Sequence, residues 1–347
     1  MSDNTVATRQ RKRLRRMAAQ GITRSTVIVH TDCRPALDAL RPHFAHAQNA
    51  PILNTVVALI EKEITKPVNV AQVKQLSLFR YPGGKTWLVP EIRKWLNTLP
   101  YRPQRFVEPF AGGGIVGLTV AAENLADQVV LSEIDDAVAS VWHTLINGSA
   151  ADVDWLCQQI LDFDMTLPNV SAILTASADT TTKRAFQTII RNRVQRGGIL
   201  APGASLMKEG ENGKGLKSRW YPETLVRRIM AIQHLRHRLI FRQEDAFAII
   251  EEWGEDPRIA WFLDPPYTAG GKKAGQRLYT HPSINHSRLF ASIMMTQGEC
   301  LMTYDDAPEV HELVQQHSLV VERVPMKNTH HNILYELLIT KAPRRAE

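Results

Sequence analysis

A short apolar segment that turns through three glycines into a helical pattern constrains the fold of this chain more than any other feature. Phe106 and Val107 lead to Glu108, and glycines occupy positions 112–114. Apolar residues then recur over 116–121 at the spacing of a helix. A strand, a glycine turn and a helix in this order form the first unit of a Rossmann-like α/β sheet.

A second strand is predicted at Val129-Val130-Leu131, and an acidic segment, Ser132-Glu133-Ile134-Asp135, follows it. An acidic side chain about 20 residues beyond the glycines of such a unit is placed to accept a hydrogen bond from a ribose hydroxyl. Glu133 is the candidate for this role. The alternative is that these acidic residues only solvate the end of the strand.

A third apolar run, Ile259–Leu263, has the length of a buried strand and ends in Asp264-Pro265-Pro266-Tyr267. Open α/β sheets place their chemistry at the carboxyl ends of such strands. The two prolines cannot continue the ladder, which leaves nearby carbonyl groups free to accept hydrogen bonds from a ligand. An ordinary proline turn after a strand is the alternative.

Residues 79–85, Phe-Arg-Tyr-Pro-Gly-Gly-Lys, precede an amphipathic helical pattern that carries Trp87, Leu88, Ile92 and Trp95. Glycines allow a ligand to approach the backbone, and the start of a helix with a lysine favours an anionic group. The spacing differs from that of a nucleotide-triphosphate loop.

These segments together resemble a known family. Residues 79–85, 107–114, 131–135 and 264–267 resemble, in this order, the motifs of Dam-type DNA adenine-N6 methyltransferases, which use S-adenosylmethionine. The similarity extends over residues 76–341. It implies an α/β fold with a Rossmann-like S-adenosylmethionine methyltransferase sheet and an inserted, mostly helical target-recognition region.

The resemblance also assigns residues to the cofactor. Tyr81 and Lys85 should border its methionine part, Glu133 its ribose and Asp245 its adenine amino group. Asp245 is equally suited to cap a helix that starts at Ala246. The full set of expected cofactor-binding residues is Tyr81, Lys85, Pro109, Phe110, Gly112, Gly114, Glu133, Ile134, Asp245, Ala246 and Asp264. The chain has Glu133 and Tyr81 where the commoner pattern has Asp and Trp.

The expected catalytic residues are Asp264, Pro265, Pro266 and Tyr267. The amino nitrogen of adenine is a poor nucleophile because its lone pair is delocalised into the ring. If the Asp264 carboxylate and the Pro265 carbonyl both accept hydrogen bonds from this amine, the lone pair is freed for direct methyl transfer. A base inside a duplex must first be flipped out, and Tyr267 is the candidate to stack on it.

The insert is expected over residues 151–238, between the two parts of a catalytic domain at 67–150 and 239–347. Residues 191–219 hold seven basic residues, two acidic ones and six glycines. A basic, glycine-rich loop can follow a phosphate backbone, and a merely solvated loop is the alternative. The expected DNA contacts are Arg191, Arg193, Arg196, Lys214, Lys217 and Arg219.

Residues 1–66 are expected to form a separate module. A cluster of arginines and one lysine over 9–16 suits contact with phosphates or a solvated tail. A strand over 24–30, a helix capped by Asp32 and a second helix from Pro51 resemble a ribbon-helix-helix module. Such modules pair their strands between two chains, which predicts a homodimer. A helical extension that packs on the main domain is the alternative.

Composition narrows the class of protein. The 347-residue chain has a net charge of +7, which permits a polyanionic partner such as double-stranded DNA. No apolar run reaches the ~18 residues of a membrane span, so no membrane partner is expected. The cysteines Cys33, Cys157 and Cys300 have no paired spacing, which indicates a cytoplasmic protein.

Two other functions stay open at this stage. N4-cytosine methyltransferases face the same chemical problem but usually carry Ser at the position of Asp264. A DNA-binding repressor with a degenerate methyltransferase domain is the second alternative. A cytosine-C5 enzyme is disfavoured, because such enzymes use a Pro-Cys nucleophile and no cysteine in this chain follows a proline.

Overall fold

A computed structural model describes residues 34–64, 72–80, 84–207, 210, 213, 215–267, 280–281, 283–327 and 333–341. The chain divides into two compact units, Met1–Lys66 and Pro67–Glu347. The predicted basic arm, the strand over 24–30, Asp32, Tyr81 and Lys214 lie outside the described residues.

In the part of the first unit that the structure describes, the α-helices are α2 (Arg34–Leu40) and α3 (Ala50–Ile64). The second predicted helix is confirmed, since α3 begins one residue before Pro51. The sequence pattern predicts Leu37, Leu40 and Phe44 on one face of the first helix. The helix α2 ends at Leu40, however, and the chain passes into a 3-10 turn at Arg41–Ala45, where a proline occupies the first turn. Phe44 therefore lies in this turn and not on the helix.

The second unit is built on a seven-stranded sheet in the order β3-β2-β1-β4-β5-β7-β6. Neighbouring strands among the first five pair in parallel, and β7 pairs antiparallel with both β5 and β6. The α/β, Rossmann-like methyltransferase fold expected from the sequence is thereby confirmed. The strands are β1 (Arg105–Glu108), β2 (Gln128–Ser132), β3 (Leu239–Arg242), β4 (Ile259–Leu263), β5 (Glu299–Asp305), β6 (Val320–Lys327) and β7 (Ile333–Thr340).

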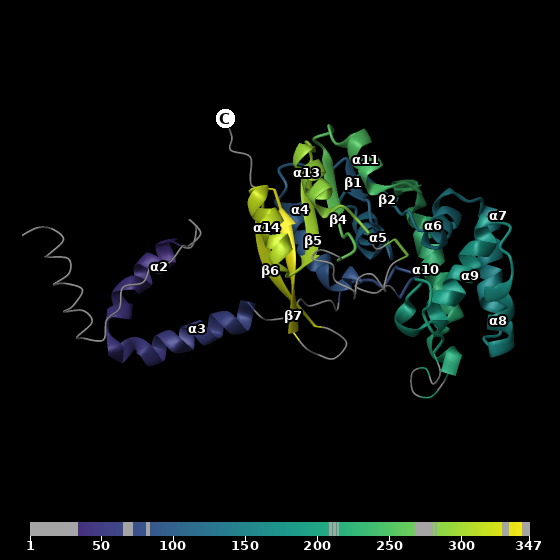
Figure 1. The fold of residues 1–347 in the computed structure, drawn as a ribbon, viewed down its shortest axis with the longest axis horizontal. Coiled ribbons are helices and arrows are strands. Elements are labelled where there is room, and N and C mark those ends of the chain that lie inside the picture. Colours follow the sequence, from purple (N-terminus) through teal and green to yellow (C-terminus); the bar gives the residue numbers. More distant parts are fainter. Residues whose placement is uncertain are drawn as a thin grey trace, which may run out of the picture. The chain divides into compact units, whose positions relative to one another are not determined.

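Helices cover both faces of this sheet (Figure 1). Phe106 of β1 joins the core on one face, and its neighbour Val107 joins the core on the other, because successive side chains of a strand point to opposite faces. The helices of the first core are α4 (Val89–Thr98), α5 (Ile115–Ala122) and α6 (Asp136–Trp142). Those of the second are α11 (Ala246–Trp253), α13 (His286–Met295) and α14 (Pro308–Gln316).

The central strand β4 shows why the apolar run at Ile259–Leu263 was predictable. All five of its residues are buried. A parallel strand covered by helices on both faces is apolar throughout and does not alternate. The strand ends at the residue before Asp264, so this carboxyl group stands at the carboxyl end of the sheet.

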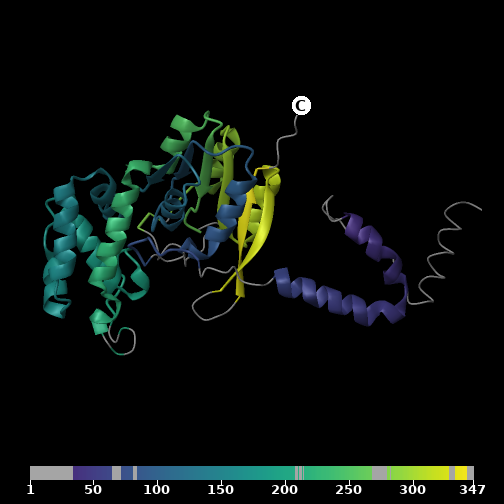
Figure 2. The ribbon, with the colours of Figure 1, turned by 180° about the vertical axis from the view of Figure 1, so that it is seen from behind.

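The insert consists mainly of α7 (Ala150–Asp162), α8 (Leu167–Thr175), α9 (Thr181–Val194) and α10 (Pro222–Leu235). Figures 1 and 2 both show these helices at one end of the sheet, with β6 and β7 at the opposite end. Phe186 and Ile229 belong to the same apolar core as Phe106 of the sheet. The insert therefore packs continuously with the sheet, and the division of this unit into domains stays a prediction from the sequence.

A membrane-spanning helix was not expected, and the described residues contain no helix that is both long and apolar enough to cross a bilayer.

Candidate active site

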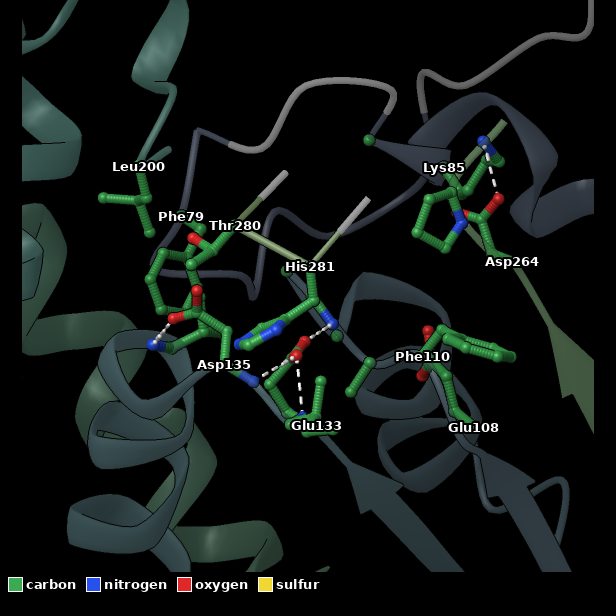
Figure 3. A pocket seen from close by; sticks show the side chains of 18 of the residues that line it. Phe79, Lys85, Glu108, Phe110, Glu133, Asp135, Leu200, Asp264, Thr280 and His281 are labelled. Atoms are coloured by element: carbon green, nitrogen blue, oxygen red, sulfur yellow. Dashed lines mark hydrogen bonds and ion pairs between the residues drawn. The ribbon is translucent and has the colours of Figure 1, made fainter. Parts of the chain in front are cut away.

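A cavity of about 490 Å³ lies at the carboxyl ends of the strands. It brings together the glycine loop, the acidic end of β2, Lys85 and Asp264 (Figure 3). In this view Phe79, Asp135 and Leu200 lie on one side, whereas Lys85, Glu108, Phe110 and Asp264 lie on the other, with Glu133 between. Segments far apart in the sequence thus form one site, as the shared strand edge requires.

The glycine loop is held in a conformation that needs glycine. Gly112 and Gly114 have positive φ angles of 46° and 60°. A Cβ at Gly114 would lie 2.8 Å from the ring of Trp142, whose Nε1 donates a hydrogen bond of 2.9 Å to the carbonyl oxygen of Gly112. Both the backbone angle and the close packing therefore exclude a larger residue at Gly114.

Gly117, which the analysis of the sequence did not single out, completes a Gly-x-Gly-x-x-Gly spacing with Gly112 and Gly114. A Cβ at Gly117 would lie 2.6 Å from both Glu108 Oε2 and a methyl group of Leu131. The third glycine of this spacing lets the helix pack closely on the sheet. The spacing itself was a signal that could have identified it.

Glu133 accepts three hydrogen bonds from backbone amides. Oε2 accepts from Gly112 at 2.9 Å, and Oε1 accepts from Ile134 at 2.9 Å and Asp135 at 3.0 Å. Burial raises the pKa of Glu133, and these amides oppose the rise. The carboxyl group thus holds the glycine loop against the end of β2. Oε2 accepts one of these hydrogen bonds and has a second lone pair that can accept another from a ligand in the cavity.

Two further acidic residues cap helices beside the cavity. Asp135 Oδ1 accepts from the amides of Ala137 and Val138, both at 2.9 Å, at the start of α6. Asp245 accepts from Phe247 N at 2.9 Å at the start of α11 and also lines the cavity. The cap predicted for Asp245 is therefore present, and its proposed contact with a cofactor is compatible with it.

Asp264 is fixed by three donors on one of its oxygens. Oδ1 accepts from the Thr303 hydroxyl at 2.7 Å and from the Tyr267 hydroxyl at 3.0 Å, and Lys85 Nζ lies 3.0 Å away. No described residue donates a hydrogen bond to Oδ2. The carboxyl group is thus held in one orientation and keeps its second oxygen for another donor.

A buried glutamate on β7 completes this cluster. Glu336 Oε2 lies 2.9 Å from the Tyr267 hydroxyl and 3.3 Å from Lys85 Nζ. Burial raises the pKa of Glu336, with Lys85 acting in the opposite direction and Asp264 in the same one. Lys85 is 5% exposed, so its charge is balanced inside the protein by two carboxyl groups.

Tyr267 packs against other side chains of the protein. Its ring stacks on Tyr304, with centroids 5.9 Å apart and planes at 21°, and Lys85 Nζ lies 4.7 Å from its centroid. Burial raises the pKa of its hydroxyl. Tyr267 is not among the described residues that line the cavity. Its stacking on a target base stays a prediction, and in this structure it orients Asp264.

Glu108 is buried at the end of β1. Its Oε2 accepts a hydrogen bond of 2.8 Å from Gly117 N. Burial, reinforced by the nearby carboxyl groups of Asp264 and Glu133, raises the pKa of Glu108 to about 8, although the Gly117 amide opposes this. A perturbed carboxyl group in a cleft is typical of functional sites.

The other predicted residues differ in their positions. Phe110, Ile134 and Pro266 line the cavity, and Ile134 is 44% exposed. Pro109, Pro265 and Ala246 are buried beside it without lining it. In the basic loop, Arg196 and Lys217 are exposed, and Arg191 and Arg219 are half-buried. Lys217 pairs with Asp164 at 3.1 Å.

Arg193 differs from a surface DNA contact. It is 5% exposed, and its Nη2 donates to the carbonyl oxygen of Leu78. The helical pattern over 182–193 places it on the buried side of α9. Arg193 is therefore not part of the exposed surface of the predicted basic loop.

Glu336 and Thr303 belong to the site but were not predicted from the sequence. An acidic residue within the apolar strand Ile333–Thr340 was the available signal, because a buried carboxyl group normally has a partner. Nothing local to Thr303 distinguishes it. It meets Asp264 only because β4 and β5 pair in parallel.

Comparisons with known proteins agree with this architecture. Residues 81–189 match the model of a family described as D12 class N6 adenine-specific DNA methyltransferase, which confirms the resemblance seen in the sequence. No curated protein matched the chain.

Solved structures resemble the chain only weakly. The rRNA methyltransferase AviRa from Streptomyces viridochromogenes is 14% identical, with a TM-score of 0.36, over 80% of this chain and 93% of that one. A precorrin-6y C5,15-methyltransferase from Geobacter metallireducens is 10% identical, with a TM-score of 0.28, over 73% and 88%. Likenesses this weak do not bear on the substrate.

Proposed function

We propose that this chain, a methyltransferase with the resemblance to the D12 class established above, transfers a methyl group from S-adenosylmethionine to N6 of an adenine in DNA. The observation that carries the proposal is a cavity lined by Asp264, whose Oδ2 has no hydrogen-bond donor among the described residues, together with the glycine loop and Glu133. The substrate follows from the chemistry of Asp264 and from the family resemblance of residues 81–189.

The residues of the cavity suit the proposed cofactor. Its volume of about 490 Å³ lies in the range of small-molecule sites. Glu133 Oε2 offers an acceptor for a ribose hydroxyl, and the exposed side chain of Ile134 offers an apolar surface for a planar ring. Asp245 lines the cavity as an acceptor for an amino group. When bound there, the cofactor supplies an activated methyl group on a sulfonium.

The protein's part in the reaction falls to Asp264. Three donors hold Oδ1, so Oδ2 is oriented before the substrate arrives and can accept a hydrogen bond from an exocyclic amine. Such preorganised acceptors need no rearrangement at the moment of reaction. The same oxygen can then take the proton that the amine must lose. Lys85 contacts both Asp264 and Glu336, and Glu336 also contacts Tyr267, so these residues keep the Asp264 carboxyl group in place.

We also propose double-stranded DNA as the partner and the first unit as a dimerisation module. Phe44, Ile52 and Val57 of this unit are 56%, 66% and 48% exposed in the single chain. Large apolar side chains gathered on one small helical unit suit pairing with a second copy. Size-exclusion chromatography with light scattering tests this: a dimer that Ile52→Glu converts to monomers supports the module, and a monomeric wild type rejects it.

The test of the main proposal is the identity of the methylated product. Purified protein is incubated with mixed-sequence duplex DNA and labelled S-adenosylmethionine, and the nucleosides are separated by mass spectrometry. N6-methyladenine is the expected product. N4-methylcytosine, label only in RNA supplied as a second substrate, or no label in either nucleic acid would each reject it.

A further inference from the structure

A second cavity of about 450 Å³ lies beside the first, and Gln75 and Phe79 line both of them. Its charge differs from that of the first cavity. The described residues that line it include three arginines and no Asp or Glu. They are Gln75, Phe79, Arg80, Arg193, Gly197, Tyr221, Thr224, Leu225 and Arg228. We refer to it as the arginine cavity.

Arg193 is the buried member of this set. Its side chain is 5% exposed, and its Nε has no hydrogen-bond partner among the described residues. Burial, reinforced by repulsion from Arg228, Arg80 and Arg219, lowers the pKa of Arg193 to about 10. A buried guanidinium with an unused donor and like charges around it is unfavourable unless an anion accompanies it.

The other two arginines are held by the fold. Asn192 is 1% exposed, accepts from Arg80 N at 2.9 Å and donates to the Arg80 carbonyl at 3.1 Å. Arg228 of α10 donates from Nη1 to the Ser77 carbonyl at 2.6 Å. Three segments distant in sequence thus converge on one cavity. Asn192 thus fixes the backbone of Arg80, and the Ser77 carbonyl fixes the guanidinium of Arg228. Guanidinium groups suit the planar, multiple hydrogen bonding of a phosphate group.

We infer that the arginine cavity binds a phosphodiester group of the DNA strand that carries the target nucleotide. The inference rests on the proposed function and adds a substrate subsite to it. A nucleotide whose base enters the first cavity must leave its phosphates outside that space. The wall of Gln75 and Phe79 makes the arginine cavity the adjoining space, and its charge is opposite to that of a phosphate.

The test compares two neighbouring arginines of α10. Arg228→Gln removes a cation that lines the cavity, and Arg227→Gln removes an exposed one that does not line it. Binding to a fluorescent duplex is measured over a series of salt concentrations without methyl transfer. Arg228→Gln should weaken binding and reduce the slope of log K against log salt by about 1, whereas Arg227→Gln should leave the slope unchanged.

A second variant guards against misfolding, because Arg228 also bonds the Ser77 carbonyl. Thr224→Glu adds a carboxylate to the cavity and keeps its three arginines, and it replaces the hydroxyl that accepts a hydrogen bond of 3.1 Å from Arg227 Nη2. It should weaken DNA binding in the same way while the melting temperature and S-adenosylmethionine binding stay close to those of the wild type.

The outcomes separate the two proposals. If the wild type fails to bind duplex DNA at low salt, the proposed function fails. If it binds and both cavity variants keep the wild-type slope, only the phosphodiester site is overturned. Tight binding of inorganic phosphate by calorimetry, together with unchanged slopes, would assign the cavity to a small anion and overturn the inference as well.

Discussion

The two adjoining cavities differ in how their buried charges are balanced. In the first, Lys85 lies between the carboxyl groups of Asp264 and Glu336, and the site's polar groups hold one another in place. In the arginine cavity, Arg193 is surrounded by other arginines. Internal pairing suits a site that must position atoms, whereas a lining with cations and no acidic residue among the described residues suits a site that receives an anionic ligand.

Each cavity also contains groups whose pKa is shifted toward the neutral form, and Glu108 and Arg193 are examples. Burial and neighbouring carboxyl groups raise that of Glu108 to about 8, and burial and neighbouring arginines lower that of Arg193 to about 10. In both cavities, these pKa shifts come from burial and from neighbouring groups of the same charge. Variants in each cavity can test whether the first cavity positions the reacting atoms and the arginine cavity binds a charged ligand.

The largest effect is expected at Asp264. Asp264→Asn should reduce the rate of methyl transfer by about 10³-fold, because an amide replaces the preorganised acceptor. Binding of S-adenosylmethionine, measured by calorimetry, should be largely retained. The exposed Asp154→Asn is the matched control and should behave as the wild type. A wild-type rate in Asp264→Asn would remove this carboxyl group from the chemistry.

A smaller effect is expected at Glu336. Glu336→Gln removes the negative charge beside Lys85 Nζ and the Tyr267 hydroxyl, two groups that also contact Asp264. We expect kcat to fall by roughly 10- to 100-fold, as small displacements of positioning groups do, with little change in the KM for DNA. Glu322→Gln on the neighbouring strand β6 is exposed and serves as the control. Equal rates for both variants would show that Glu336 does not position the site.

The arginine cavity can be disturbed through the backbone. Gly198 has a φ of 74°, and a Cβ there would overlap the Arg80 carbonyl oxygen, whereas Gly203 has a φ of 84° with nothing within 4 Å. Both Gly→Ala changes incur the same backbone strain of about 1–2 kcal/mol. Gly198→Ala should destabilise the protein by roughly 2 kcal/mol more, as overpacking does, and should also weaken DNA binding. Denaturant unfolding and duplex binding provide the measurements, and equal behaviour of the two variants would contradict the packing argument.

The smallest effect is a pH dependence from Glu108. Its pKa is raised from 4.5 to about 8 on folding, so between these values the folded state holds a proton that the unfolded state lacks. The free energy of unfolding should therefore fall as pH rises, by up to about 1.4 kcal/mol per pH unit. Urea unfolding at pH 6 and pH 7 should show this slope in the wild type and a flatter one in Glu108→Gln. Identical slopes in the two proteins would contradict it.

Much of the sheet was predictable from local pattern. β4 has the predicted bounds, and α11 begins at Ala246 as predicted. Long apolar runs flanked by prolines, glycines or acidic residues leave few alternatives for a strand or helix. The helices α8 and α14 were not predicted, because each is short and has in its first turn a proline that equally suits a loop.

The site was predictable only in part, and the reason is the range of the interactions involved. Asp264, Glu133 and the glycine loop each stand at the end of a strand, and sheet topology alone gathers such ends. Arg193 was expected on the surface because a basic loop is usually solvated. Its burial depends on how α9 packs against the segment that carries Leu78. These two segments are too far apart in the sequence for a local pattern to reveal their contact.

The amino-acid sequence by itself therefore determined the strands, the glycine turn and the acidic residues that follow each strand, since these depend on backbone geometry and local burial. Only the tertiary structure decided which side chains surround them. Antiparallel pairing places β7 beside β5, so that Glu336 reaches Tyr267 and Lys85. Likewise, three arginines from distant segments share a cavity because helix packing, and not sequence order, sets the distances between their charges.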